Sequence, residues 1–388
     1  MNNFTHHIPT KIYFGKDQIE HLAELSAYGK KVLMIGYAEG AGIVTDIYKK
    51  AVEILTANGI ATFALEDVDP NPKIQSVRKG VEICKKHAID MVLAIGGGSC
   101  IDCAKNIAAG ALYDGDPWDL ILQPQKISQA LPIFCISTIA ATGSEMDGDA
   151  VISDMTKNEK WSATSDYFKP RMSICDPSYT YTVPAKQTAA GTADIMSHVY
   201  ECYFTNVPDG FFQARLCEAI LKTCIYYGPI ALREPNNYSA RANLLWSSCW
   251  AMNGLLWEGA EVRWGLHAIE HELSAFYNIT HGEGLAILTP KWMELALNEK
   301  TVDKFVEYAV NVWGVSFCGD KFKTAKAGIE QTQKFFEGEM HLPTTLKEVG
   351  ITEDIHFEEM AEKAANSIKG SYIPMDKDMI IRLYRACL

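Results

Sequence analysis

Short apolar runs alternate with amphipathic stretches through the first half of the chain. Within each run the apolar residues are consecutive and do not alternate with polar ones, as expected for strands that are covered on both faces. The amphipathic stretches repeat apolar residues every three to four positions, which predicts helices. The order of strand, helix and strand predicts an α/β fold with a parallel sheet and helices on both of its faces. The strands are predicted at residues 31–36, 61–66, 91–95, 133–137 and 173–175, and the helices at residues 46–57 and 74–87.

The pattern changes near Tyr181-Thr-Val-Pro184. Beyond this point apolar residues recur with helical spacing, and no convincing strand follows. A chain of 388 residues also exceeds what one hydrophobic core usually organises. We therefore predict two domains, an α/β domain over residues 1–183 and an all-α domain over residues 184–388. The helices of the second domain are predicted at residues 186–205, 211–227, 241–256, 265–276, 284–297, 301–313, 321–336 and 357–365.

Charge and cysteine content narrow the cellular setting. The net charge of −12 argues against nucleic acid and against anionic membranes as partners. No apolar run reaches the roughly 18–20 residues needed to span a bilayer, and the start of the chain lacks the features of a signal peptide. The 11 cysteines show no disulfide-like spacing, which favours free thiols in a reducing compartment. We therefore expect a cytoplasmic protein without a membrane partner.

A glycine-rich turn, Gly96-Gly-Gly98-Ser99, follows the predicted strand at 91–95 and opens a helix. Glycines let the backbone approach a pyrophosphate closely, and a helix N-terminus offers free N–H groups to it. The spacing differs from the Gly-x-Gly-x-x-Gly of the usual dinucleotide fold. Two other interpretations stay open: Ser99 and Asp102 form a modified capping box, or the glycines make a plain tight turn.

A second loop, Ser137-Thr-Ile-Ala-Ala-Thr-Gly-Ser-Glu145, is rich in hydroxyl groups and also follows a predicted strand. Open α/β sheets bind ligands at the carboxyl ends of their strands. Thr138 and Thr142 are therefore candidates for lining a cofactor groove. The alternative is a serine and threonine loop that only caps the next helix.

Three clusters in the second half have the composition of a metal site. Asp194 and His198 are four residues apart, as are His267 and His271, and residues with that spacing share one face of a helix. His281 follows shortly afterwards. A carboxylate with several imidazoles suits a divalent first-row metal such as Zn²⁺ or Fe²⁺. Spacing does not decide whether His271 is a ligand or a neighbour.

Four motifs occur together in this chain. They are Gly-Gly-Gly-Ser-x-x-Asp-x-x-Lys at 96–105, Ala-Ala-Thr-Gly-Ser-Glu at 140–145, Asp-x-x-x-His at 194–198, and His267-x-x-x-His271 followed by His281-Gly. With these motifs the chain resembles the iron-containing (group III) alcohol dehydrogenases along nearly its whole length. Residues 176–184 and 191–194 are similar to the butanol dehydrogenase branch of that family, which includes bacterial broad-range aldehyde reductases.

The resemblance implies a dinucleotide-binding domain over residues 1–183, a helical metal-binding and catalytic domain over residues 184–388, and an active site in the cleft between them. It implies one divalent metal, Fe²⁺ or Zn²⁺, and a homodimer formed through the nucleotide-binding domain. It also implies a place for His271 near the nicotinamide as a proton relay. The implied metal ligands are Asp194, His198, His267 and His281. The residues implied to contact the cofactor are Gly97, Gly98, Ser99, Asp102, Thr138, Thr142, Lys160 and Tyr179.

One departure from these relatives bears on the choice of cofactor. The relatives place a Gly-Gly-Gly-Ser turn after the first strand, whereas this chain has Gly36-Tyr-Ala-Glu-Gly-Ala-Gly42. Glu39 would accept a hydrogen bond from a ribose 2′-OH and repel a 2′-phosphate, which favours NADH over NADPH. Lys160 matches a position at which relatives contact the ribose side of the cofactor, and this favours NADPH. Asp147 stands where some relatives carry asparagine.

The function implied by the resemblance is that of an NAD(P)H-dependent dehydrogenase, which reduces small aliphatic aldehydes to primary alcohols and catalyses the reverse oxidation. The alternatives are a glycerol or other polyol dehydrogenase of the same architecture, and a metallohydrolase with Glu201 or Glu270 as its base. Glu201, one helical turn beyond His198, is otherwise an ordinary exposed acid. A hydrolase would need neither the glycine turn nor the loop with Thr138 and Thr142.

Overall fold

The computed structural model describes residues 1–37, 39–66, 68–207 and 209–388, and its contacts divide the chain into two compact units. The first, here called the sheet unit, comprises His7–Val183 and Pro235–Asn253. The second, here called the helical unit, comprises Met1–His6, Pro184–Glu234 and Gly254–Leu388. Each unit is therefore built from more than one stretch of chain, whereas the sequence pattern predicted one division at residue 183.

The sheet unit contains a six-stranded sheet in which every neighbouring pair of strands is parallel. The strand order is β1-β8-β5-β4-β2-β3. The predicted parallel sheet is thus confirmed, although β1, an edge strand of four residues, was not predicted. The strands are β1 (Lys11–Phe14), β2 (Lys31–Gly36), β3 (Ala61–Glu66), β4 (Met91–Gly96), β5 (Ile133–Ser137) and β8 (Met172–Cys175).

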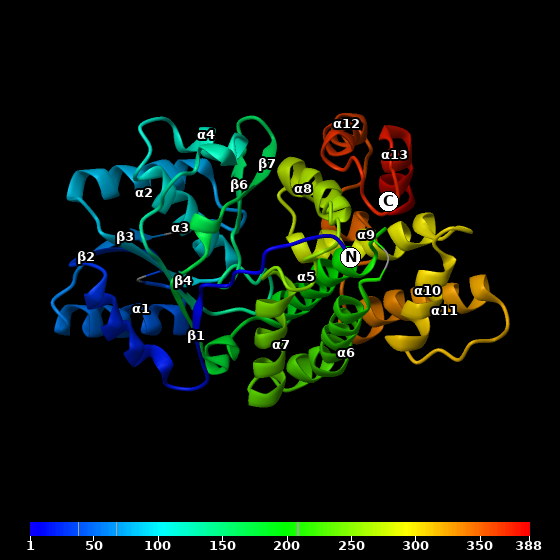
Figure 1. Ribbon diagram of the computed structural model, residues 1–388, viewed down its shortest axis with the longest axis horizontal. Helices are drawn as coiled ribbons and strands as arrows, with labels where there is room; N and C mark the ends of the chain where they lie inside the picture. The colour runs from blue at the N-terminus through cyan, green and yellow to red at the C-terminus, as the bar shows by residue number, and fades with distance from the viewer. Residues whose placement is uncertain (38, 67, 208) are drawn as a thin grey trace. The chain divides into compact units, whose positions relative to one another are not determined.

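Both faces of the sheet are covered, which explains why its central strands are apolar at every position. Along β2, Val32 and Met34 point into a core formed with η1 (Gln18–Ala27) and α1 (Ile43–Ala57). Leu33 and Ile35 point into a second core, formed with two further helices on the opposite face. Figure 1 shows α1 on one side of the sheet and this second pair on the other. These two helices are α2 (Ile74–His87) and α3 (Gly98–Gly110).

An antiparallel hairpin beside the main sheet was not predicted from the sequence. Its strands are β6 (Asp149–Asp154) and β7 (Glu159–Thr164). The backbone N–H of Ser153 donates to the carbonyl of Pro72 at 2.9 Å, which ties the hairpin to the loop after β3. About half of the hairpin residues are polar or charged, so the stretch lacks the apolar run that reveals the central strands. The remaining elements of this unit are α4 (Pro117–Leu122), η2 (Pro124–Lys126), η3 (Asp166–Phe168), η4 (Pro177–Thr180) and α7 (Tyr238–Ala251).

The described residues of the helical unit form helices and no strands, as predicted. None of the helices in the described part of the chain is long and apolar enough to cross a membrane. The predicted helices are all present, but the one predicted at 241–256 is α7, which belongs to the sheet unit. Among the described residues, α13 and the short η6 were not predicted. The helices are α5 (Ala185–Tyr203), α6 (Phe211–Arg233), α8 (Gly265–Tyr277), α9 (His281–Ala296), α10 (Val302–Asn311), α11 (Lys321–Lys334), η5 (Phe335–Glu339), η6 (Lys347–Val349), α12 (Phe357–Ser367) and α13 (Lys377–Ala386).

The first turn of α9 packs directly on the backbone of α5. A Cβ atom at Gly282 would lie 2.0 Å from the carbonyl oxygen of Ala190, a distance that no side chain can occupy. Glycine is therefore required here because the two backbones touch. The close approach brings His281, the first residue of α9, to the buried middle of α5.

Candidate active site

Four predicted ligands come together from three helices of the helical unit. Asp194 and His198 lie on α5, His267 on α8 and His281 at the start of α9. One oxygen of Asp194, Oδ1, lies 3.8 Å from His198 Nδ1, 3.9 Å from His267 Nε2 and 3.6 Å from His281 Nε2. These separations are too long for hydrogen bonds. They are close to the roughly 3.3–3.6 Å that separates two ligands of one tetrahedral cation with bonds of about 2.0–2.2 Å.

The donor atoms fit a bound cation in burial as well as in spacing. The ligand atoms of Asp194, His267 and His281 all lie within 4.8 Å of one another. His198 joins this group from the side, with its ring stacked on that of His267 at a centroid distance of 4.5 Å. The Nε2 atom of His267 and the Nδ1 atom of His198 are buried without a hydrogen-bond partner. A buried nitrogen in this state costs free energy, and coordination to a cation would remove the cost.

The protonation state of His198 suits a metal ligand. Burial lowers its pKa well below 6.5, and the neighbouring His267 and His281 lower it further. The ring is therefore neutral near pH 7. A neutral imidazole has a lone pair to offer, which coordination requires.

Glu201 lies behind His267 and is not the exposed acid that the sequence left possible. Its side chain is only 8% exposed. Glu201 Oε1 accepts from His267 Nδ1 at 2.9 Å and from the backbone N–H of the same residue at 2.8 Å. The signal in the sequence is the spacing, because Glu201 stands seven residues after Asp194 and so lies on the same face of α5.

Glu270 plays the same part for His281. It is fully buried, and its carboxylate contacts His281 Nδ1 and accepts from the Ser274 hydroxyl at 2.6 Å. The metallohydrolase alternative uses Glu201 or Glu270 as a base. Both carboxylates are engaged by histidines of the cluster, which argues against that alternative.

His271 lies beside the Asp194 group rather than inside it. Its ring centroid is 5.4 Å from that of His281 and 6.4 Å from that of His267. It forms a second cluster with Glu270 and His281, and its side chain is partly exposed. The structure thus separates His271 from the three residues that share the shortest mutual distances.

The predicted cofactor residues of the sheet unit lie at the carboxyl ends of its strands. Residues 97–99 follow β4, Thr138 follows β5, and Glu39 is exposed in the loop after β2. From β2 the chain moves outward to β3 and then returns to β4 on the other side of β2. The β2 and β4 ends therefore flank the point where the strand order reverses, which is where open α/β sheets bind their ligands.

The glycine turn and the hydroxyl-rich loop pack against each other. A Cβ atom at Gly97 would lie 2.6 Å from Ile139 Cγ2, and one at Gly98 would lie 2.6 Å from Thr142 Oγ1. The two glycines therefore allow the loop to close over the start of α3. The N-cap of α3 is Gly97, and no side chain caps it. The capping box considered for Ser99 and Asp102 is accordingly wrong.

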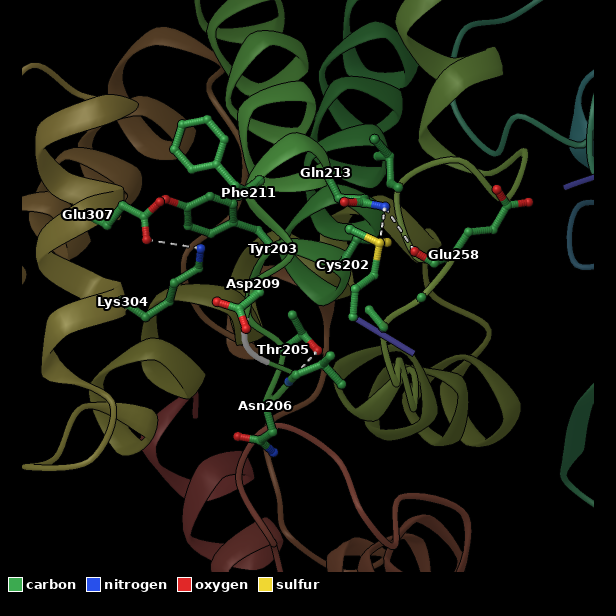
Figure 2. Close-up of a pocket in the computed structure, with 17 residues that line it drawn as sticks. Cys202, Tyr203, Thr205, Asn206, Asp209, Phe211, Gln213, Glu258, Lys304 and Glu307 are labelled. Atoms are coloured by element: carbon green, nitrogen blue, oxygen red, sulfur yellow. Dashed lines mark hydrogen bonds and ion pairs between the residues drawn. The ribbon is translucent and has the colours of Figure 1, made fainter. Parts of the chain in front are cut away.

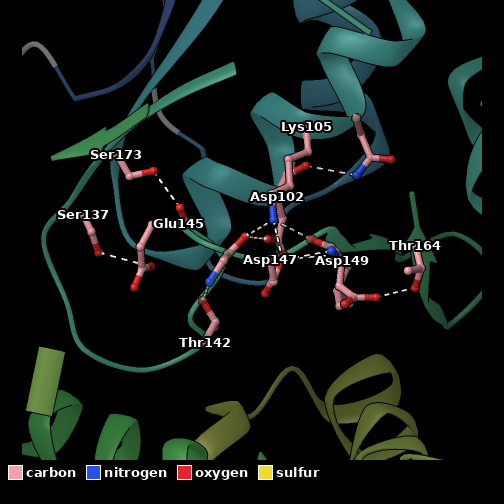
Figure 3. Close-up of polar contacts among 12 residues, drawn as sticks. Asp102, Lys105, Ser137, Thr142, Glu145, Asp147, Asp149, Thr164 and Ser173 are labelled. Atoms are coloured by element: carbon pink, nitrogen blue, oxygen red, sulfur yellow. Dashed lines mark hydrogen bonds and ion pairs between the residues drawn. The ribbon is translucent and has the colours of Figure 1, made fainter. Parts of the chain in front are cut away.

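Asp102 is turned inward instead. Its carboxylate accepts from the Ser144 hydroxyl at 2.6 Å and from the backbone N–H of Val151 at 3.0 Å, and the residue is only 8% exposed. Figure 3 shows this carboxylate among the polar contacts between α3 and the loop. The structure thus engages both carboxylate oxygens of Asp102 with protein donors.

Lys105, the last residue of the motif at 96–105, is the centre of that polar cluster. Its ammonium is fully buried and donates to Asp147 Oδ1 at 2.6 Å, to the Ser144 hydroxyl at 2.8 Å and to the carbonyl of Asp149 at 2.7 Å (Figure 3). Burial favours the neutral amine, but the charges of Asp147 and Asp102 outweigh it, so the pKa of Lys105 is raised. The asparagine-to-aspartate departure at 147 therefore supplies the counter-charge of a buried lysine.

Two further predicted cofactor residues belong to later elements of the sheet unit, Lys160 to the hairpin and Tyr179 to the turn that follows the carboxyl end of β8. Lys160 is on β7, and its charge contributes, after burial, to the lowered pKa of Lys73 at the start of α2. Tyr179 is half-buried in η4, and burial raises its pKa to about 12. The phenol of Tyr179 is therefore protonated near neutral pH and able to donate a hydrogen bond.

A pocket of about 400 Å³ lies at another place in the helical unit, where α5 ends and α6 begins. Figure 2 shows its charged rim, with Lys304 and Glu307 paired at 3.2 Å beside Tyr203. The described residues that line it include none of the predicted site residues. This pocket is therefore separate from the Asp194 group.

Comparison with known proteins identifies the family. Residues 9–177 match the family described as iron-containing alcohol dehydrogenase, and residues 188–388 match its C-terminal description. NADH-dependent butanol dehydrogenase B of Clostridium acetobutylicum is 51% identical, with 99% of each chain covered. NADPH-dependent aldehyde reductase YqhD of Escherichia coli is 37% identical over 90% of each chain. The crystal structure of NADH-dependent butanol dehydrogenase A from Thermotoga maritima is 35% identical, has a TM-score of 0.93, and is matched over 100% of this chain and 99% of its own.

The chain belongs to the iron-containing alcohol dehydrogenase family, and it is an oxidoreductase. Within that family it groups with the butanol dehydrogenases and aldehyde reductases, as the resemblance at residues 176–184 and 191–194 predicted.

Proposed function

We propose that this protein is an NADH-dependent dehydrogenase that interconverts small aliphatic aldehydes and primary alcohols at one divalent cation, Fe²⁺ or Zn²⁺. The ligands are Asp194, His198, His267 and His281. The observation that carries the proposal is the set of three imidazole nitrogens at 3.6–3.9 Å from one carboxylate oxygen. The names of the relatives, butanol dehydrogenase and aldehyde reductase, support the substrate class.

A divalent cation in this set supplies a Lewis acid for the substrate oxygen, and a nicotinamide supplies the hydride chemistry. The protein contributes the geometry. Among the four ligands only Asp194 carries a negative charge, so the ligands themselves would leave one of the two positive charges of a divalent cation uncompensated. His271, next to His281, passes a proton to or from that oxygen, a task that suits an imidazole near neutral pH.

In the sheet unit, the backbone N–H groups at Gly97, Gly98 and Ser99 hold the cofactor phosphates at the start of α3. Thr138 and Thr142 offer hydroxyl groups beside them, and Lys160 and Tyr179 complete the contacts. Asp102 supports this site indirectly, because its carboxylate accepts a hydrogen bond from Ser144 and so holds the loop that contains Thr138 and Thr142.

The preference for NADH follows from Glu39. Its exposed carboxylate stands in the loop after β2, where it would accept a hydrogen bond from a ribose 2′-OH and repel a 2′-phosphate. The relatives include enzymes named for each cofactor. Comparison of kcat/KM with NADH and NADPH tests this point, and a clear preference for NADPH would remove the role of Glu39.

We also propose a cytoplasmic homodimer with no nucleic acid or membrane partner. The support is the net charge of −12, the free cysteines, and the resemblance to relatives that dimerise. Light scattering of the purified protein measures the assembly state, and a monomer would contradict the proposal.

The decisive experiment combines metal analysis of the purified protein with NADH oxidation assays on aldehydes of increasing chain length. We expect close to one metal ion per chain and turnover of butanal. Asp194→Ala should lose metal and activity together, whereas His271→Ala should keep its metal and turn over more slowly. Full activity of a metal-free protein would overturn the proposal, and loss of metal in His271→Ala would overturn the role given to that histidine.

A further inference from the structure

Two buried carboxylates link the three helices that carry the metal cluster. Glu201 on α5 bonds to His267 on α8, and Glu270 on α8 bonds to His281 on α9. Each acid thus holds a histidine of the next helix. The three helices are tied together in the order in which they follow one another along the chain.

Both histidines are held in the same orientation. The Nδ1 atom of each ring faces its carboxylate, and the Nε2 atom faces Asp194 Oδ1 at 3.9 Å for His267 and 3.6 Å for His281. A carboxylate accepts hydrogen bonds and cannot donate one, so the proton of a neutral ring must sit on Nδ1. The lone pair is then on Nε2, on the side of the cluster.

We propose that Glu201 and Glu270 are positioning residues that fix the tautomer and the ring orientation of His267 and His281, and thereby set the affinity of the cluster for a divalent cation. This inference rests on the metal site proposed above. Acids behind metal-bound histidines also make the imidazole a stronger ligand, because they stabilise the positive charge that the ring acquires.

Each carboxylate is itself held by a second donor. Glu201 also accepts from the backbone N–H of His267, and Glu270 accepts from Ser274 at 2.6 Å. The space for Glu270 depends on Gly284, since a Cβ atom there would lie 2.7 Å from Glu270 Oε1. The second glycine of His281-Gly-Glu-Gly284 is therefore required by the carboxylate that orients His281.

The three acids also matter as charges. Asp194, Glu201 and Glu270 are 5%, 8% and 0% exposed, so water screens their negative charges weakly. A divalent cation among them offsets most of this charge. Glu201 and Glu270 thus favour binding of the cation without being ligands.

The affinity for Zn²⁺ alone tests the proposal without any measurement of turnover. Glu201→Gln and Glu270→Gln keep an oxygen that accepts from Nδ1 but remove the charge, whereas the alanine variants remove both. We expect the alanine variants to bind Zn²⁺ about 10–100-fold more weakly in competition with a chelator, and the glutamine variants to show an intermediate loss. Glu294→Gln, an exposed acid on the same helix as His281, is the matched control and should bind as wild type does.

A purely structural role for the two acids would give another pattern. In that case the metal-free and Zn²⁺-saturated forms of each variant would lose the same number of degrees in Tm, with no change in affinity. Our proposal expects the increase in Tm caused by Zn²⁺ to shrink, while the Tm of the metal-free form changes less. Wild-type affinity in all four variants would overturn it.

Failure of the underlying metal site gives a different result. Wild-type protein would then bind no Zn²⁺, or Asp194→Ala would bind it as tightly as wild type does. If wild type binds and Asp194→Ala does not, the site stands, and the Glu201 and Glu270 variants alone decide the inference.

Discussion

Each unit of this protein buries a cluster of carboxylates, and the two clusters balance their charge differently. In the sheet unit, Asp102 and Asp147 surround the ammonium of Lys105, which donates three hydrogen bonds. In the helical unit, Asp194, Glu201 and Glu270 face imidazole nitrogens. Lys105, with its raised pKa, is positively charged near neutral pH, whereas a neutral imidazole carries no charge. The first cluster is therefore complete as the chain folds, and the second is suited to receive a cation from solution.

The clusters also differ in what they hold in place. Lys105 joins α3 to residues 144–149, and so fixes the loop that closes over Gly97 and Gly98. The Asp194 cluster joins three helices around a point where donor atoms converge. In the sheet unit the buried charges hold a loop in shape. In the helical unit the buried charges are arranged to bind an ion.

Loss of a metal ligand should have the largest effect on activity. Asp194→Ala removes the only charged member of the ligand set. We expect it to lose bound metal, and kcat/KM to fall by at least about 100-fold, because several kcal/mol of charge stabilisation are lost at about 1.4 kcal/mol per tenfold. Metal analysis and an NADH absorbance assay measure the two effects. Lys105→Met should retain its metal, and metal loss in that variant would erase the distinction between the clusters.

Loss of the internal cation should have the largest effect on stability. Lys105→Met leaves buried carboxylates without their counter-charge, a change that costs about 3–5 kcal/mol when one partner of a buried pair is removed. Chemical denaturation monitored by circular dichroism gives the free energy of unfolding. Lys85→Met, an exposed lysine on α2 whose ammonium contacts the carbonyl of Tyr113, is the control and should differ little from wild type.

Acid should restore part of the stability that Lys105→Met loses. Burial raises the pKa of Asp147, and of Asp102, above the ordinary value of 3.8. A carboxyl group with a raised pKa in the folded state stabilises the fold while it is protonated, and this contribution disappears as the pH rises through that pKa. The Tm of the variant should therefore approach that of wild type as the pH falls from 8 to 5. A difference in Tm that stays constant over this range would contradict the charge argument.

Substitution of Gly284 should have a smaller effect, limited to the affinity for Zn²⁺. Gly284→Ala places a Cβ atom against Glu270 Oε1, so the carboxylate must move away from His281. We expect Zn²⁺ affinity to fall about tenfold, at the lower end of the loss seen when a residue behind a metal ligand is removed. Gly338→Ala is the control, because nothing lies within 4 Å of the Cβ atom that it introduces.

The smallest effect concerns the cofactor. Glu39→Ser removes a carboxylate that is exposed to solvent, and exposed charges act weakly on one another. We expect the ratio of kcat/KM for NADH to that for NADPH to fall about three- to fivefold, which corresponds to about 0.7–1 kcal/mol. An unchanged ratio would show that Glu39 does not select the cofactor.

The sequence predicted the sheet because its signal is local. The strands β2, β3 and β5 have the predicted bounds. For β2 and β5 the signal is a nearly continuous apolar run, because these central strands are buried on both faces, whereas β3 is a partly exposed edge strand. The metal cluster was also visible, because residues four apart share a face of a helix. Neither signal depends on knowing which elements contact each other.

The missing parts all depend on contacts between residues far apart in the chain. The spacing places Glu201 on the face of α5 that carries Asp194, but the contact of Glu201 with His267 and that of Glu270 with His281 depend on the packing of α5, α8 and α9. The hairpin of β6 and β7 has a mixed polar pattern because it lies beside the main sheet rather than within it. Lys105 appeared in the sequence only as the last residue of the motif at 96–105, and its burial is explained by its contacts with residues 144–149.

The division of the chain has a practical consequence for anyone who wishes to study one unit alone. The helix α7 (Tyr238–Ala251) is separated from the rest of the sheet unit by the long stretch Pro184–Glu234, yet its Cys249 thiol lies 3.0 Å from Glu145. A fragment cut at residue 183 would expose Met146 and Cys175, which α7 normally covers. A fragment that ends there should aggregate, and a soluble nucleotide-binding fragment would need α7 joined to it through a new linker.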